Sequence, residues 1–318
     1  MFKIVLICSF FILFPLQNKA SDLESPAARW GHVFVYDQLR NEILLFGGAL
    51  DAKTFVNDTW IWNQDGWRKI DISGPSARGF SAATYHPGRK TIVIHGGRSN
   101  TGNTLSDSWE WNGEKWNQIA SENKYVADHH QMVYVHDEKS IIAFGGWNGQ
   151  SVLGDTWYFK NSWKKSNIIS PPARASFGMA YNEIKSTISL YGGLWVNGQY
   201  ADIWQWKLGQ WKELGGPYDQ SSLDHHAMFY DKKTNKIIGF GGKNYRYKTP
   251  GKIFEINESD MKVINFSSGP SPRHSVGITY HNKNQKAYIF GGKELSNGKQ
   301  LPLSDLWSWD SMKWKKIE

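Results

Sequence analysis

Cysteine is almost absent from this chain, which has a single Cys8 in 318 residues. Cys8 lies in a segment with the three parts of a secretory signal peptide: Lys3, the apolar run 4–16, and the small or polar residues that follow it. We therefore predict a signal peptide at 1–20 and a mature chain, 21–318, without any thiol. Such a chain can form neither a disulfide framework nor a cysteine metal site nor a cysteine nucleophile.

Long apolar runs and strong charge are also scarce. No later run reaches the roughly 20 apolar residues that a membrane helix needs, so we expect no transmembrane anchor after signal cleavage and a secreted or periplasmic protein. The formal net charge is +8 and falls to +6 without Lys3 and Lys19. This modest excess suits an anionic partner, but in an exported protein it argues against nucleic-acid binding.

Sustained helical periodicity is missing as well. Short apolar runs such as 32–36 and 43–46 are bounded by turns rich in Asp, Asn, Gly and Lys, of which 231–236 is one example. This pattern predicts an all-β chain.

The chain contains six copies of a unit in which a hydrophobic run ends at a glycine pair. The pairs are Gly47-Gly48, Gly96-Gly97, Gly145-Gly146, Gly192-Gly193, Gly241-Gly242 and Gly291-Gly292. Successive pairs are 49, 49, 47, 49 and 50 residues apart, and a period near fifty indicates repeats of one unit rather than separate domains. We therefore predict a single domain over 21–318.

Other residue types keep a fixed place relative to the glycine pair. A tyrosine stands eleven residues before every pair, at Tyr36, Tyr85, Tyr134, Tyr181, Tyr230 and Tyr280. Four units have an arginine seven residues before this tyrosine, at Arg29, Arg78, Arg174 and Arg273. Most units continue with the pattern D-x-W-x-W, as at 58–62. Because the arginines and aspartates recur with the repeat, we expect them mainly to hold loops together.

These residues resemble the kelch repeat from Pro26 to Glu318. The resemblance implies a six-bladed kelch β-propeller with four antiparallel strands per blade around a central channel. The blades would span approximately 26–73, 74–121, 122–169, 170–217, 218–268 and 269–318. We expect a monomer that exchanges no strand, or only a fragment of 21–27, across the seam between its first and last blades.

The resemblance also predicts where a ligand would bind. The loop before each first strand and the loop after each glycine pair would lie on one face, called here the mouth face, where the channel opens. Fourteen of the seventeen Trp residues occupy repeat positions, whereas Trp30, Trp147 and Trp195 fall on this face. These three either wedge between blades or form an aromatic platform on which a sugar ring or peptide side chain stacks.

Units three and five share a second irregularity on the mouth face. Asp128-His129-His130 and Asp224-His225-His226 stand where other units have the arginine segment. His and Asp are able to exchange protons or to hydrogen-bond a sugar or carboxylate, and His is also a metal ligand. Adjacent strand residues face opposite sides, so both His of a pair reach one ion only across a turn. The alternative is that Asp caps a turn while one His packs between blades. We expect no metal and no other cofactor.

Unit five departs furthest from the repeat. Its loop after the glycine pair interleaves basic residues with tyrosines, as Lys243, Tyr245, Arg246 and Tyr247. Such a loop suits an anionic partner, although it is equally understandable as a solvated loop on a weakened blade.

Two propeller enzymes are relevant comparisons. Galactose oxidase is similar to this chain in its kelch propeller, but its copper chemistry uses a tyrosine cross-linked to cysteine, which a mature chain without thiols cannot supply. Resemblance to the exported N-acetylneuraminate epimerase implies an acid/base pair at the mouth, for which His129, His225, Asp128 and Asp224 are candidates, with Arg246 for a carboxylate. We predict a binding module for a glycan or a protein at the mouth, with a sugar mutarotase or epimerase as the alternative.

Overall fold

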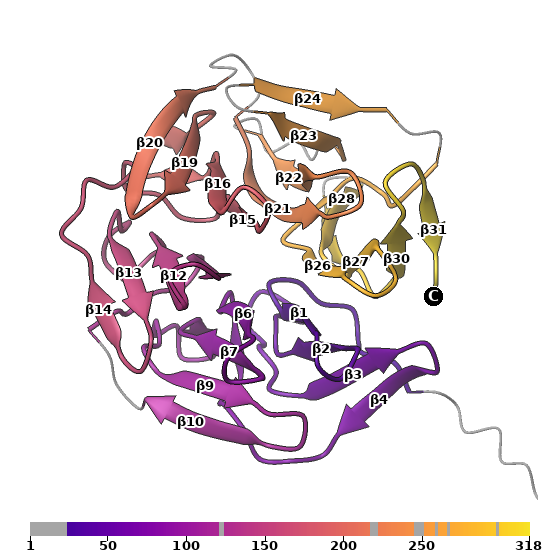
Figure 1. Cartoon of the computed structure of the whole chain (residues 1–318). Helices are drawn as coiled ribbons and strands as arrows, with labels where there is room; N and C mark the ends of the chain where they lie inside the picture. The colour runs from indigo at the N-terminus through magenta and orange to yellow at the C-terminus, as the bar shows by residue number, and fades with distance from the viewer. Residues whose placement is uncertain are drawn as a thin grey trace, which may run out of the picture.

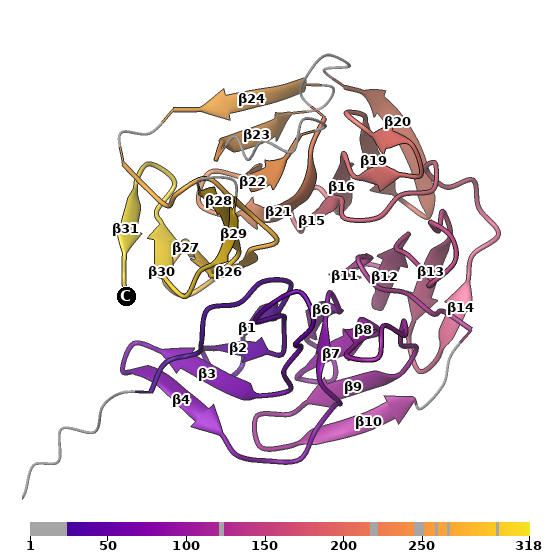
Figure 2. The ribbon, with the colours of Figure 1, turned by 180° about the vertical axis from the view of Figure 1, so that it is seen from behind.

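The computed structural model describes residues 24–120, 124–216, 222–244, 251–257, 260–265, 268–296 and 299–318. Every regular element within these ranges is a β-strand, which confirms the predicted all-β class. The strands form six four-stranded sheets that stand around a common centre like the blades of a propeller (Figures 1 and 2). The predicted signal peptide lies outside the described residues.

The first three sheets follow one another along the chain. The first contains β1 (Val33–Asp37), β2 (Glu42–Phe46), β3 (Thr59–Asn63) and β4 (Gly66–Ile70). The second contains β6 (Ala82–His86), β7 (Thr91–His95), β9 (Ser108–Trp111) and β10 (Trp116–Ala120). The third contains β11 (Gln131–Val135), β12 (Ser140–Phe144), β13 (Thr156–Phe159) and β14 (Trp163–Lys165).

The last three sheets repeat this order. The fourth contains β15 (Gly178–Asn182), β16 (Thr187–Tyr191), β19 (Ile203–Lys207) and β20 (Gln210–Gly215). The fifth contains β21 (Asp224–Asp231), β22 (Lys236–Lys243), β23 (Ile253–Asn257) and β24 (Asp260–Ile264). The sixth contains β26 (Gly277–His281), β27 (Lys286–Phe290), β30 (Leu306–Trp309) and β31 (Trp314–Lys316). In each sheet the first strand lies nearest the centre and the fourth lies at the rim (Figures 1 and 2).

Small additional sheets arise on the mouth face in units two, four and six, where the segment before a first strand or the loop after a glycine pair is itself extended. They are β5 (Arg78–Gly79) with β8 (Arg98–Ser99), β17 (Leu194–Trp195) with β18 (Gly198–Gln199), and β25 (Arg273–His274) with β28 (Lys293–Ser296) and β29 (Lys299–Pro302).

The glycine pairs are required by contact between neighbouring units. Gly47 has φ 65°, and a Cβ there would lie 2.6 Å from the carbonyl oxygen of Arg78 in the next unit. The N–H of Gly48 donates to this same carbonyl at 2.9 Å. Gly292 donates likewise to the carbonyl of Arg29, so the contact also joins the last unit to the first. A side chain at the first glycine would push the units apart.

The recurrent arginines are structural, as predicted. All four are at most 2% exposed, and each binds the aspartate that follows the glycine pair of its own unit. The same aspartates accept a hydrogen bond from the indole of the next recurrent tryptophan. The pairs are Arg29 with Asp58, Arg78 with Asp107, Arg174 with Asp202, and Arg273 with Asp305.

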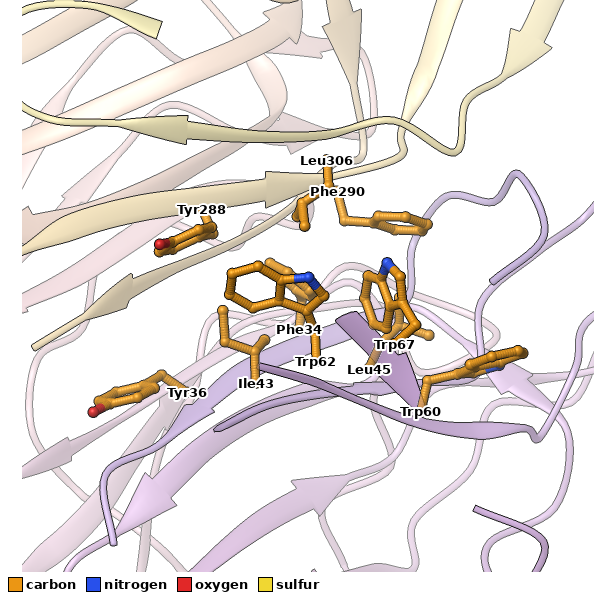
Figure 3. Close-up of a cluster of buried hydrophobic side chains, with 10 residues drawn as sticks. All are labelled: Phe34, Tyr36, Ile43, Leu45, Trp60, Trp62, Trp67, Tyr288, Phe290 and Leu306. Atoms are coloured by element: carbon orange, nitrogen blue, oxygen red, sulfur yellow. The ribbon is translucent and has the colours of Figure 1, made fainter. Parts of the chain in front are cut away.

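The hydrophobic core is divided into clusters between neighbouring sheets, and Figure 3 shows the one at the seam. Trp62 and Trp67 of the first sheet pack on Tyr288 and Phe290 of the sixth, with ring centroids 4.8 and 5.1 Å apart. All strands of the first sheet come from the first repeat and all strands of the sixth from the last. Among the described residues, no strand is exchanged across the seam, as predicted.

Candidate functional site

A closed ring of backbone hydrogen bonds surrounds the channel at the mouth face. One residue from each unit takes part, and its N–H donates to the carbonyl of its counterpart in the preceding unit at 2.6–3.0 Å. The bond from the first unit to the last completes the ring. All six residues have φ between 53° and 60°, although only one is a glycine. They are Gly31, Phe80, His129, Ser176, His225 and Ser275.

These left-handed conformations are uncommon for residues with a Cβ and persist only where surrounding structure enforces them. Sequence reasoning singled out His129 and His225 but missed Phe80, Ser176 and Ser275. A signal was present, because each of the five stands at the same distance before the repeat tyrosine. Nothing in their residue types predicts that they meet.

Ring side chains crowd together over the mouth. The rings of Phe80 and His129 stack with centroids 3.9 Å apart, and the His129 ring lies 5.4 Å from that of His225. His274 continues the series, with its ring 5.8 Å from His225. The first histidines of units three and five, His129 and His225, therefore lie close together and face the mouth.

Each of these two histidines hydrogen-bonds the aspartate before it. Asp128 lies 2.5 Å from Nδ1 of His129 and also accepts hydrogen bonds from Arg98 and Thr104. Burial opposes ionisation of Asp128, but the hydrogen bond and charge of His129, together with Arg98, outweigh burial and lower its pKa. The carboxylate is therefore held ionised beneath the ring.

Asp224 and His225 form the second pair. Asp224 accepts hydrogen bonds from His225 and Gln199, and Nζ of Lys243 lies 3.6 Å from its carboxylate. Here too burial opposes ionisation, and the partners, led by His225, lower the pKa of Asp224. Burial lowers the pKa of His225 to about 4 despite the neighbouring carboxylate, so the imidazole is neutral at physiological pH.

The second histidine of each pair is buried, so the ligand-binding alternative is wrong for His130 and His226, which pack between sheets. His130 is 1% exposed and lies edge-on to His95 and Tyr125 between sheets. His226 is 4% exposed and packs against Tyr191. A left-handed residue precedes each of them, so the chain turns one imidazole to the mouth and the next into the core.

The three irregular tryptophans do not form a common platform, so the platform alternative is wrong for the set as a whole. Trp30 is 6% exposed, and Nζ of Lys293 lies 3.8 Å from the centre of its ring. Trp147 is half-buried, and its backbone bridges Asp128 and Val152. Trp195 is 42% exposed and remains available to a ligand.

Exposed apolar side chains gather on two hairpins of the mouth face. Trp195 and Val196 lie on the β17–β18 hairpin, with Val196 76% exposed. Leu295 and Leu301 lie on the β28–β29 hairpin and are 43% and 42% exposed. These four residues are called here the apolar hairpin tips.

Three residues that directly follow a glycine pair add positive charge to the mouth face. They are Arg98, Lys243 and Lys293. Burial lowers the pKa of Lys293, and the charge of Lys243 lowers it further, so these two ammonium groups lie near one another. Tyr245, Arg246 and Tyr247 of the predicted anionic-ligand loop lie outside the described residues.

The described ranges contain neither a clustered metal site nor a membrane-spanning helix. No group of three or more His, Cys, Asp or Glu side chains there is placed to hold a metal ion. The same ranges contain no helix that would cross a membrane. The channel holds a cavity of about 370 Å³ that is lined by the first strands and the ring residues.

The four-stranded sheets around a channel, with ligand-accessible loops on one face, define this protein as a β-propeller with a candidate site at its mouth. A family model described as KLHDC2/KLHL20/DRC7 Kelch-repeats domain matches residues 16–193, and the chain belongs to the kelch-repeat family. No curated protein matches the sequence. The sheets beyond residue 193 repeat the arrangement of those within the match.

Proposed function

We propose that this chain is an exported kelch propeller that binds a protein partner across its channel mouth. Kelch-repeat domains generally bind proteins, and the apolar hairpin tips carry the proposal within this chain. Large apolar side chains exposed on the loops of one face are typical of protein-binding surfaces, where a few aromatic anchors dominate the affinity.

Lys293 favours a partner with acidic residues, whereas the charge of Lys243 is already paired with that of Asp224. Lys293 is the first residue of β28 in the β28–β29 hairpin and is held over Trp30. Complementary charge would accelerate association and orient the partner, while the apolar hairpin tips would supply most of the affinity. The exported location rests on the signal-peptide pattern of residues 1–20.

Selection from a random-peptide phage library on the purified protein tests the binding function. We expect apolar peptides with acidic residues to be enriched, and we expect Trp195→Ala and Leu295→Ala to weaken their binding at least tenfold. Ile184→Ala is the matched control, because Ile184 is 68% exposed on a turn of the opposite face. Equal binding by wild type and both mouth variants would contradict the proposal, as would binding to a glycan array only.

Export is tested separately by cell fractionation and N-terminal sequencing. We expect the chain outside the cytoplasm with its N-terminus within a few residues of position 21. An unprocessed chain retained in the cytoplasm would overturn this part of the proposal.

A further inference from the structure

Ser176, His225 and Asp224 are connected in series at the mouth. Oγ of Ser176 lies 3.2 Å from Nε2 of His225, and Nδ1 of the same imidazole is hydrogen-bonded to Asp224. An ionised carboxylate only accepts, so Nδ1 carries the proton of the neutral imidazole. Nε2 is then an acceptor for the Ser176 hydroxyl. A hydroxyl, an imidazole and a carboxylate linked in this order are the arrangement that activates a nucleophilic serine.

The backbone ring holds the first two groups in place. His225 N–H donates to the carbonyl of Ser176 at 2.7 Å, and Ser176 N–H donates to the backbone carbonyl of His129 at 2.9 Å. Both residues have the left-handed backbone, with φ 56° for Ser176 and 54° for His225. The serine and its base are thus fixed relative to one another although they are 49 residues apart in sequence.

The carboxylate is fixed equally well. Asp224 is 1% exposed and is held by Gln199 and Lys243 in addition to His225. Ser176 and His225 both border the channel cavity, where the His225 side chain is 15% exposed and Ser176 is 7% exposed. A small molecule in the mouth would meet the hydroxyl, whereas a bulky one would not.

We propose that Ser176 is a nucleophilic serine that reacts with small carboxylic esters and related electrophiles in the channel mouth, an activity beyond protein binding. Oγ of Ser176 forms a bond to the ester carbonyl carbon while its proton passes to Nε2 of His225. The bond from that carbon to the alkoxy oxygen breaks, and the departing alcohol takes the proton. Water, deprotonated by the same imidazole, then displaces the acyl group as a carboxylic acid and restores the serine.

Ser275 provides a comparison within the same ring. It has φ 53° and the equivalent position in unit six, and its Oγ lies 3.0 Å from Nδ1 of His274. The other nitrogen of His274 lies 3.1 Å from the side-chain oxygen of Gln300, which is an amide and not a carboxylate. Ser275 is also more exposed than Ser176. Reaction at Ser176 but not at Ser275 would therefore depend on the Asp224–His225 pair and not on exposure.

A small alkyl fluorophosphonate tests the proposal with the full chain. Attack by Oγ forms an oxygen–phosphorus bond, fluoride departs, and His225 accepts the serine proton. We expect intact-mass analysis to show one adduct per chain and peptide mapping to place it on Ser176. Ser176→Ala should abolish the adduct, and Ser275→Ala should leave its rate unchanged. Since a general base contributes about 10²- to 10⁴-fold, His225→Ala should slow labelling about a hundredfold or more.

Asp224→Asn and a pH profile separate chemical activation from structure. Asp224→Asn should slow labelling while Ser176 stays in place, and the rate should be nearly constant between pH 6 and 8, because burial lowers the pKa of His225 to about 4. If Asp224→Asn does not fold, Ser176→Ala and Ser275→Ala still test the proposal, because each removes only a hydroxyl. No adduct on the wild type, equal labelling of Ser176 and Ser275, or an undiminished rate in folded His225→Ala would overturn the proposal.

Discussion

The guanidinium of Arg174 binds both carboxylate oxygens of Asp202, with nitrogen–oxygen distances of 2.6 and 2.7 Å. Nη1 of Arg174 also donates to the carbonyl of Gly192 at 3.0 Å. This side chain therefore connects the segment before β15 to the glycine pair that follows β16. Both side chains are largely buried, at 0% and 10% exposed. Breaking one partner of such a pair leaves a buried charge without compensation.

We predict that Arg174→Leu destabilises the protein by about 3–5 kcal/mol, because Asp202 is then buried without its cation. Urea unfolding followed by tryptophan fluorescence measures the change. Arg68→Ala is the control, since Arg68 is 60% exposed and lies 3.9 Å from Glu42, a geometry worth at most about 1 kcal/mol. Equal effects of the two substitutions would refute a stabilising role for the recurrent pair.

We predict that Trp111→Ala costs about 3–5 kcal/mol of unfolding free energy, because the ring is 1% exposed and packs on Trp116 between the first and second sheets. Trp109, two residues earlier on β9, is only half-buried, so Trp109→Ala should cost less. Thermal unfolding compares the two variants. A Trp111→Ala midpoint equal to that of Trp109→Ala would show that this burial does not set stability.

We predict that Tyr125→Phe lowers stability by about 1 kcal/mol. Unit three lacks the recurrent arginine, and the Tyr125 hydroxyl donates to the carbonyl of Gly145 at 3.0 Å, the glycine carbonyl that arginine binds in four other units. Tyr181→Phe is the matched control, because the Tyr181 hydroxyl is buried and has no hydrogen-bond partner among the residues that the structure describes. Urea midpoints should fall for the first variant and stay level or rise for the second.

We predict that stability falls as the pH drops below 6.5. Burial lowers the pKa of His226 to about 4 and that of His32 to about 3, whereas an unfolded histidine titrates near 6.5. The unfolded chain therefore binds protons that the folded chain does not, so the stability is fully present above pH 6.5 and is lost as the pH falls towards 4. For His226 alone the loss is about 2 kcal/mol at pH 5.

His226→Phe should reduce this pH dependence, because Phe177 occupies the equivalent place in unit four. Urea midpoints at pH 7.5 and pH 5 should differ less in the variant than in the wild type. An identical pH dependence in both proteins would exclude His226 as a contributor.

The repeat pattern of the sequence by itself determined much of the fold. Glycine pairs, tyrosines and D-x-W-x-W at constant spacing mark local strands and turns, and local features are readable from a sequence because neighbouring residues alone decide them. The recurrent arginines were also correctly predicted to be structural, because a residue that recurs in several units usually makes the same contact in each of them. Among the described residues, the absence of strand exchange also agrees with the prediction made from the positions of the first and last repeat units.

Only the tertiary structure decided which irregular residues reach the mouth. Trp30 is covered by Lys293, which is distant in sequence and arrives when the ring closes at the seam. The side chains of His129 and His130 point to different places because the backbone ring enforces a left-handed conformation at His129. The residue type at that position does not predict this conformation. Ser176 meets His225 for the same reason: the bond between their backbones exists only when neighbouring sheets stand side by side around one channel. Contacts of this kind depend on closure of the whole ring, so they cannot be predicted from the local sequence.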